Sequence, residues 1–289
     1  MTVTVSGGAA VLPSRSIGDR AVSAIGLGGA PIALAAHIPD ERSAVRTVHA
    51  ALDAGVTVLD TADVYSPGLG QGYSELIFGR AVRTWGPGRD DVLIATKGGK
   101  YWRPDGEVQV NGRPEYLAQA CEASLRVLGT DVIGLYQFHE PDPAVPFEES
   151  IGALADLRAA GKVRQIGISN TDTSLIRRAL AVTPVASVQN RLGPGHPYGA
   201  AEIALCEQEG LAFLAYSPLK GLVTGDRFAE VARRHGVSPQ QVALAWELSL
   251  SPAVIPIPGA TRPPTILDSV HAAALTLSPS DLATLEGIQ

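Results

Sequence analysis

Residues 114–139, PEYLAQACEASLRVLGTDVIGLYQFH, contain a helix pattern followed directly by a strand pattern. Pro114 and Glu115 indicate a helix start, because proline fits the first turn and an acidic side chain there complements the helix dipole. Gly129 indicates its end, since glycine readily adopts the left-handed conformation that closes a helix. The apolar run 131–139 predicts a strand buried on both faces. The stretch therefore reads as one helix–strand unit of an α/β fold.

The same unit recurs along the chain. Apolar runs predict eight strands, at residues 23–29, 56–60, 91–97, 131–139, 162–169, 185–190, 211–217 and 253–258. Amphipathic runs predict the helices, at residues 41–54, 74–84, 114–128, 147–160, 173–181, 198–209, 238–249 and 263–273. Eight strands that are each followed by a helix within about 250 residues predict a (β/α)₈ TIM barrel. We expect residues 1–289 to form this one domain.

A doubly wound sheet is the competing α/β architecture. It is disfavoured because no strand is followed by G-x-G-x-x-G: Gly26 and Gly28 precede Pro31, where the third glycine would stand. Four segments fall outside the repeat. We predict an N-terminal hairpin, a long polar loop, an extra helix and a last helix, at residues 15–23, 98–113, 225–236 and 279–287.

Composition excludes several classes of protein. The net charge is −6 and no basic run exceeds a pair, which argues against nucleic-acid or anionic-membrane partners. Only two cysteines occur, Cys121 and Cys206, and both lie in apolar helical patterns that suit a reducing compartment. The N-terminus lacks a signal-peptide pattern, and no apolar run approaches the roughly 18 residues of a membrane span. We expect a cytoplasmic protein without a metal site.

Four titratable residues are predicted to converge at one end of the barrel. Asp60, Lys97 and His139 end the second, third and fourth strands, and Tyr65 follows in the loop after the second. The carboxyl ends of barrel strands are where such enzymes carry out chemistry. Singly, each residue has an ordinary interpretation as a turn cap, a solvated lysine or a core histidine. Their joint placement favours catalysis.

Proton delivery to a carbonyl oxygen suits these four side chains. A tyrosine is a poor acid near neutrality unless a cation favours its phenolate, and Lys97 can supply that charge. Asp60 can hold the ammonium in place, and His139 can orient the carbonyl by a hydrogen bond. None of the four donates hydride, so a cofactor must supply the reducing equivalent.

The chain resembles the aldo-keto reductases over essentially its whole length. The motifs that carry the resemblance are IGLG (25–28), DTADVYSPG (60–68), GYSE (72–75), RDDVLIATK (89–97), SLRVLGTDVIGLYQFH (124–139), GKVRQIGISN (161–170), QN (189–190), AYSPLKGLVTG (215–225) and PIPGATR (256–262). The resemblance implies a barrel that binds NADPH without a Rossmann motif and reduces aldehydes or ketones. It assigns the catalytic tetrad to Asp60, Tyr65, Lys97 and His139, with Tyr65 as proton donor.

The resemblance also implies a cofactor site. Ser169, Asn170 and Gln189 would bind the nicotinamide carboxamide, and Tyr216 would stack on its ring. A buried polar side chain such as Gln189 needs a partner in any case. The remaining implied contacts are Ser217, Pro218, Leu219 and Gly221 around the pyrophosphate, and Gly28, Gly259, Thr261 and Arg262 elsewhere along the cofactor.

The adenosine end departs from many family members. Their lysine, arginine and glutamate–asparagine pair are replaced here by Gly259, Thr265, Asp268 and Ser269. Arg262, at the start of the last barrel helix, remains as the candidate for the 2′-phosphate, where the helix dipole also favours an anion. We therefore expect NADPH, with NADH possible.

The substrate, a small carbonyl compound, should contact the variable loops. The candidates are Ala30, Pro31 and Ile32 after the first strand, Tyr101 and Trp102, Glu140, and the loop 191–198, with Pro31, Trp102 and Glu140 foremost. Trp102 offers a flat apolar wall, and Glu140 an acidic group that would favour a cationic or hydroxyl-rich substrate. The short C-terminus predicts an open site. A monomer or weak homo-oligomer is expected.

Three other functions compete with reduction. An NAD-dependent dehydrogenase would run the same tetrad oxidatively on a sugar or polyol. A non-catalytic protein of this fold would use bound NADPH as a redox sensor. A Schiff-base aldolase acting through Lys97 is disfavoured, because an amine nucleophile needs a depressed pKa whereas Asp60 should keep Lys97 charged.

Overall fold

The apolar runs form one closed sheet. The protein is represented by a computed structural model that describes residues 12–66, 72–86, 88–196, 199–223, 225 and 227–285. Its central sheet has eight strands, all parallel, in the order of the chain. They are β3 (Leu27–Gly28), β4 (Val58–Asp60), β5 (Leu93–Gly98), β8 (Ile133–Phe138), β9 (Val163–Ser169), β10 (Ser187–Arg191), β11 (Ala212–Tyr216) and β12 (Val254–Pro256).

The first and last strands meet and close the barrel. A parallel bridge joins Gly28 to Gly259, and the Gly28 amide donates to the Pro258 carbonyl at 2.9 Å. Glycine is needed here because a Cβ on Gly28 would stand 2.7 Å from the carbonyl oxygen of Ile257. The predicted (β/α)₈ barrel is confirmed, and the first strand pairs over a shorter length than the predicted 23–29.

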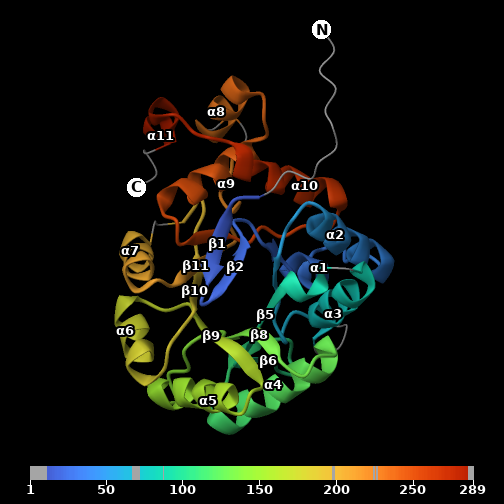
Figure 1. Ribbon diagram of the computed structural model, residues 1–289, viewed down its shortest axis with the longest axis vertical. Coiled ribbons are helices and arrows are strands. Elements are labelled where there is room, and N and C mark those ends of the chain that lie inside the picture. The colour runs from blue at the N-terminus through green and yellow to red at the C-terminus, as the bar shows by residue number, and fades with distance from the viewer. Residues whose placement is uncertain are drawn as a thin grey trace.

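Helices surround the barrel, as Figure 1 shows. The ring comprises α2 (Glu41–Asp53), α3 (Tyr73–Trp85), α4 (Pro114–Leu128), α5 (Phe147–Ala159), α6 (Thr173–Val182), α7 (Ala200–Glu209), α9 (Pro239–Leu250) and α10 (Pro263–His271). Further short helices are α1 (Ala30–Leu34), α8 (Arg227–His235), α11 (Pro279–Leu285), η1 (Arg89–Asp91) and η2 (Ala272–Ala274). α8 matches the predicted extra helix, and α11 the described part of the predicted last helix; residues 286 and 287 lie outside the described ranges.

Helix α4 has the bounds that its sequence predicts. Pro114 occupies the first turn, and Gly129 ends the helix with φ of 69° while its amide donates to the Leu125 carbonyl at 3.0 Å. Leu117, Cys121 and Leu128 face the core, since they recur at helical spacing. Local signals therefore suffice to predict the bounds of this element.

An N-terminal hairpin covers one mouth of the barrel. Strands β1 (Ser14–Ile17) and β2 (Arg20–Ser23) pair antiparallel and lie over the barrel opening in Figure 1. Ile17 and Val22 are buried and pack with the inward side chains of the barrel strands. The predicted hairpin is confirmed, and its apolar face closes the amino-terminal end of the barrel, which leaves the other mouth for chemistry.

Two segments after early strands differ from the prediction. The expected loop 98–113 holds a second antiparallel hairpin of β6 (Lys100–Trp102) and β7 (Val108–Val110). Its turn contains Pro104, Asp105 and Gly106, a typical turn sequence, and Gly106 has φ of 86°. Ala30–Leu34, expected to be a loop, forms α1, because Pro31 suits a first helical turn and Ile32 is fully buried.

The remaining structural observations agree with the composition. Cys121 and Cys206 are free thiols buried in the core, and burial raises the pKa of each to about 12. Among the described residues, no helix has the length and apolarity needed to cross a bilayer.

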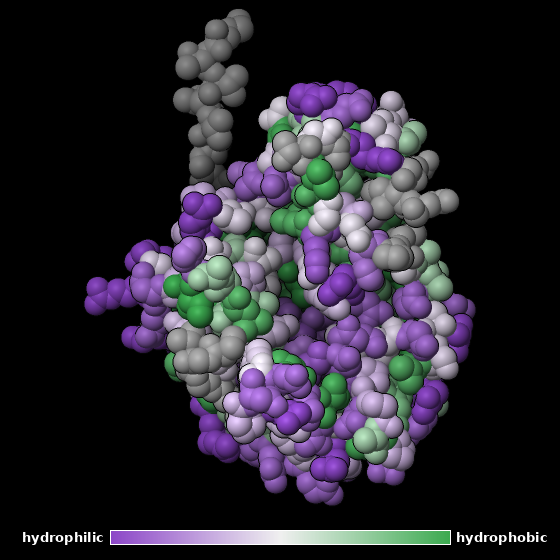
Figure 2. Space-filling model, turned by 180° about the vertical axis from the view of Figure 1, so that it is seen from behind, coloured by the Kyte–Doolittle hydropathy of each residue, from purple (hydrophilic) through white to green (hydrophobic). Residues whose placement is uncertain are grey.

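Seen from the side opposite the N-terminal hairpin, the molecule is hollowed near its centre, and hydrophilic residues border this mouth (Figure 2).

Candidate active site

A buried ion pair lies at the centre of the open mouth. Lys97 Nζ stands 2.7 Å from Asp60 Oδ2 and donates to the Thr61 carbonyl at 2.8 Å. Asp60 pairs with Ala95 in the sheet register, so Lys97 lies one step along the same inward row of β5. The two side chains are almost inaccessible, at 0% and 4% exposure. Such a pair is stable only because each charge has partners.

Two glutamines hold the second oxygen of Asp60. Gln189 Nε2 donates to Oδ1 at 2.8 Å and Gln137 Nε2 donates at 3.2 Å. Gln189 Nε2 also donates to Gln137 Oε1 at 3.3 Å, so both of its N–H groups have partners within the protein and only its amide oxygen remains for a carboxamide. Sequence reasoning missed Gln137. The available signal was its position two residues before His139, which places both side chains on one face of a strand.

Tyr65 and His139 meet beside the ion pair. Their rings contact edge to face with centroids 5.8 Å apart, and Lys97 Nζ lies 5.1 Å from the Tyr65 centroid. Tyr65 reaches this place because the chain turns directly after β4, where its amide donates to the Ala62 carbonyl at 3.2 Å. The four residues predicted to converge therefore do so.

The charges of Lys97 and Tyr65 follow from burial and from each other. Burial acts to lower the pKa of Lys97, but the attraction of Asp60, followed by that of Tyr65, raises it above its usual value overall. Lys97 is consequently an ammonium at neutral pH. For Tyr65, burial raises the pKa more than Lys97 lowers it. The expected lowering by Lys97 is present but outweighed, so the tyrosine keeps its proton.

His139 is a neutral imidazole at physiological pH. Burial, with added repulsion from Lys97 and Lys100, holds the pKa of His139 well below its usual range. Its Nδ1 is buried without a hydrogen-bond partner among the described residues. A neutral ring next to Tyr65 can still donate one N–H to a substrate oxygen. It adds no second positive charge beside Lys97.

Two of the predicted cofactor contacts have strained backbone. Asn170 and Ser217, which follow β9 and β11, have φ of 59° and 55°. These are the only non-glycine residues with positive φ in the described ranges, and such strain is often found at functional sites. Ser169 Oγ donates to the Gln189 carbonyl at 2.8 Å, and the Tyr216 hydroxyl donates to Asn170 Oδ1 at 2.7 Å. These hydrogen bonds thus link the carboxyl ends of β9, β10 and β11.

The loop after β11 can receive an anion. The backbone N–H groups of Leu219 and Gly221 make no hydrogen bond within the described ranges, and Pro218 has no N–H. Free amides in a turn form a concave donor site that suits phosphate oxygens. Gly221 must be glycine, because its φ is 97° and a Cβ would stand 2.3 Å from the Cα of Gly195. The loop therefore fits the predicted pyrophosphate position.

Arg262 lies where the sequence predicts the adenosine end of the cofactor. Arg262 is exposed at the N-terminus of α10, beside the partly exposed Thr261. Its side chain makes no capping hydrogen bond to the helix. Asp268 is engaged elsewhere, accepting from Ser238 at 2.7 Å and from Gln241 at 2.6 Å, while Ser269 is buried. Among the described residues Asp268 forms no ion pair with Arg262, which therefore remains available for a phosphate. Gly28 and Gly259 lie at the barrel seam, where they are needed for packing.

The structure places the predicted substrate residues in different environments. Trp102 is 37% exposed and its Nε1 donates to the Val64 carbonyl at 2.7 Å, which fixes the indole beside Tyr65. Glu140 forms an ion pair with Lys100, so the expected free acidic group is neutralised. Ile32 belongs to the core, and Pro31 packs against Gly259. Residues 197 and 198 of the expected loop lie outside the described residues.

A polar pocket adjoins the ion pair of Lys100 and Glu140. Its volume is about 600 Å³, and its walls include Asn170, Arg191 and Tyr216. The Arg191 guanidinium lies 5.7 Å from the centroid of the Tyr216 ring, a contact that sequence reasoning did not foresee. The pocket opens directly onto predicted cofactor residues, so a molecule bound there would be close to the strand ends.

Comparisons with known proteins agree with this geometry. Among curated proteins, the chain is 32% identical over 295 residues to a probable aldo-keto reductase of Glycine max, with 90% of this chain and 84% of that protein covered. It is 29% identical to the Klebsiella pneumoniae aldo-keto reductase solved in complex with NADPH, with 96% and 95% of the two chains covered and a TM-score of 0.78.

A dehydrogenase is also similar in structure. The glycerol dehydrogenase of Gluconobacter oxydans is 28% identical, with 95% and 94% of the two chains covered and a TM-score of 0.83. The sequence model described as the Aldo/keto reductase family matches residues 24–289, nearly the whole chain. Together with the barrel and the residues at its open mouth, this match shows that the chain belongs to the aldo/keto reductase family, a family of oxidoreductase enzymes.

Proposed function

We propose that the protein is an NADPH-dependent reductase that converts an aldehyde or ketone to the alcohol, with Tyr65 as proton donor. The observation that carries the proposal is the contact of Tyr65 with both Lys97 and His139 above the Asp60 ion pair. When bound, NADPH would supply the hydride. The residues of this chain would orient the carbonyl and deliver the proton.

The proton step follows from the charges in the site. Tyr65 is protonated at neutral pH, since burial raises its pKa, and it can donate to a carbonyl oxygen as negative charge develops there. The phenolate that remains would be stabilised by the adjacent Lys97 ammonium, which Asp60 keeps charged. Neutral His139 would hold the carbonyl oxygen by its N–H. The low-dielectric surroundings strengthen each of these contacts.

Three features support binding of a nicotinamide dinucleotide, and the third of them distinguishes NADPH from NADH. The free amides of Leu219 and Gly221 suit a pyrophosphate, the ring of Tyr216 suits a nicotinamide, and the exposed guanidinium of Arg262 suits a 2′-phosphate. The Klebsiella relative that was solved with NADPH supports the same cofactor here.

Fluorescence titration with NADPH and with NADH tests this preference. NADPH should bind the wild type more tightly, and Arg262→Ala should lose about tenfold in NADPH affinity while NADH affinity changes little. Arg177→Ala, an exposed arginine on α6, serves as the control. Equal binding of both cofactors by the wild type would contradict the NADPH assignment.

Oxidation of a polyol with NAD is the second candidate. It is favoured by the similarity to the Gluconobacter glycerol dehydrogenase and by the single arginine at the adenosine end. Turnover of polyols with NAD, combined with poor carbonyl reduction by NADPH, would select it. A Schiff-base aldolase is not supported, because the pKa of Lys97 is raised and an amine nucleophile needs it lowered.

A further inference from the structure

A second pocket lies at the end of the barrel opposite the catalytic tetrad. Its volume is about 440 Å³, and it is bordered by the beginnings of β5, β8 and β9 and by the C-terminal ends of α3 and α4. Chemistry in barrel enzymes takes place at the carboxyl ends of the strands, so this amino-terminal pocket is not part of the reaction site. It is open to solvent beside the N-terminal hairpin.

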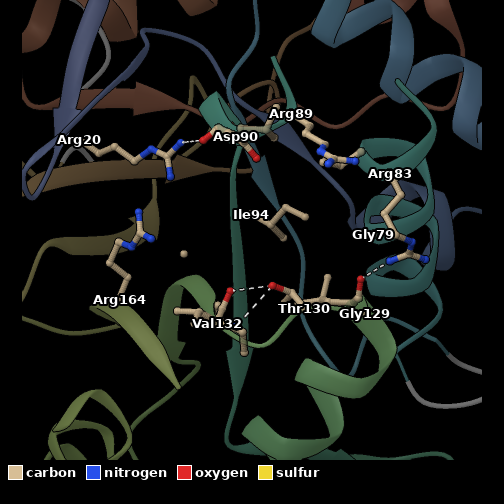
Figure 3. Close-up of a pocket in the computed structure, with 15 residues that line it drawn as sticks. Arg20, Gly79, Arg83, Arg89, Asp90, Ile94, Gly129, Thr130, Val132 and Arg164 are labelled. Atoms are coloured by element: carbon tan, nitrogen blue, oxygen red, sulfur yellow. Dashed lines mark hydrogen bonds between the residues drawn. The ribbon is translucent and has the colours of Figure 1, made fainter. Parts of the chain in front are cut away.

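Four arginines surround this pocket. Figure 3 shows Arg20 and Arg164 on one side and Arg83 and Arg89 on the other, with Ile94 between the two pairs. They come from β2, from β9 and from the neighbouring elements α3 and η1, so three separate parts of the chain supply them. One acidic residue, Asp90, lines the same pocket and partly offsets their charge. The chain as a whole carries −6, so this positive pocket differs from the average surface.

Two of the arginines have a structural use. Arg83 Nη1 donates to the Leu128 carbonyl at the end of α4, and Arg20 Nη2 donates to the Asp90 carbonyl. Positive side chains commonly satisfy carbonyl groups at helix ends, so these two contacts need no ligand. Each guanidinium nevertheless retains further N–H donors, because arginine carries five.

The other two arginines lack such a use. Within the parts of the chain that the structure describes, neither Arg89 nor Arg164 donates a side-chain hydrogen bond or forms an ion pair. They reach the pocket from its two opposite sides (Figure 3). Guanidinium groups bind carboxylate and phosphate oxygens in a bidentate manner, which makes both available for an anionic ligand.

From this arrangement we infer that the amino-terminal pocket binds a small dianion whose two anionic groups are separated by a short spacer. One group contacts Arg164 and Arg20, and the other contacts Arg89 and Arg83. The apolar side chain of Ile94 packs against the spacer between them. Two separated anionic groups match the two pairs better than a single one, because each pair then receives its own counter-charge.

Isothermal titration of the full chain tests the inference. The protein is first saturated with NADPH, so that the cofactor site does not take up the probes. The two probes are succinate and inorganic pyrophosphate, which are both mainly dianions at mildly acidic pH and which distinguish carboxylate from phosphate chemistry; acetate is the monoanionic comparison. The variants are the double substitution Arg89→Gln with Arg164→Gln, and Arg177→Gln as a matched arginine on α6 away from the pocket.

The inference predicts that at least one dianion binds the wild type and the Arg177→Gln variant equally, and more tightly than acetate. The double variant should bind it at least tenfold more weakly, because charge-assisted hydrogen bonds are lost. Carbonyl reduction should be unchanged in the double variant, since both residues are remote from the tetrad. Two results would overturn the inference: no binding of either dianion at about 1 mM, or equal binding by all three proteins.

Discussion

Gln189 on β10 donates a hydrogen bond of 2.8 Å to Asp60 on β4, across the barrel interior. The two residues are 129 positions apart in the chain. Asp60 in turn holds Lys97 at 2.7 Å, so the amide contributes to the position of the ammonium beside Tyr65. Lys97 is therefore oriented by contacts from both sides of the barrel.

Replacing Gln189 should affect the chemical step through Asp60. We expect Gln189→Met to lower kcat about tenfold, because one hydrogen bond to the buried carboxylate is lost and Lys97 is less well held. The NADPH dissociation constant should change less than threefold or so. Steady-state kinetics and fluorescence titration measure the two effects. An unchanged kcat together with much weaker NADPH binding would instead assign Gln189 to the cofactor alone.

Removing the hydroxyl of Tyr65 should stop reduction. Tyr65→Phe retains the ring that contacts His139 but loses the proton donor, so kcat should fall about a hundredfold or more. NADPH affinity should stay close to that of the wild type. Tyr73→Phe, in the first turn of α3, is the control for loss of a hydroxyl outside the site. Full reductase activity in the Tyr65 variant would refute the proposed mechanism.

The pH dependence of reduction should lack a step near neutrality. The pKa of His139 is held well below its usual range, so the ring is already neutral when the pH exceeds that lowered value. The pKa of Tyr65 is raised, so the proton donor is lost only on the alkaline side of the usual value. We therefore expect kcat/KM to vary little between about pH 6.5 and 9. An ionisation near 6.5 that disappears in His139→Gln would contradict this assignment.

Glu247 is expected to lower the stability of the barrel. This side chain of α9 is fully buried, and neither carboxyl oxygen has a hydrogen-bond partner within the described residues. Burial raises its pKa well above the usual value, so the folded protein holds a proton that the unfolded chain releases above about pH 4.5. The part of the destabilisation that comes from ionisation is thus absent at low pH and grows as the pH rises, while the cost of burying an unpaired polar group remains.

Glu247→Leu should therefore raise the free energy of unfolding by about 1–3 kcal/mol at neutral pH. Urea denaturation at about pH 4 and pH 7 should show a gain that is larger at the higher pH. Glu247→Gln should remove the pH dependence but gain less, because an unpaired amide stays buried. A Leu variant that is less stable than the wild type at pH 7 would show that Glu247 has a partner.

Local sequence determines the bounds of helices such as α4 and predicts which strand-end residues share a face of the barrel. The spacing of apolar residues, Pro114 at a helix start and Gly129 at its end define α4 without reference to the rest of the chain. Strand ends at Asp60, Lys97 and His139 predict one shared face, because parallel barrel strands all present their carboxyl ends on the same side. Helix period, strand period and capping act over a few residues, which is why they can be read from sequence.

Only the tertiary structure decides how distant side chains pair. It couples Gln189 and Gln137 to Asp60, pairs Glu140 with Lys100, and makes burial outweigh Lys97 in setting the pKa of Tyr65. It also gathers four arginines from separate elements at the amino-terminal mouth. Barrel closure determines these distances and the loss of solvent around each group, and neither quantity is contained in local spacing.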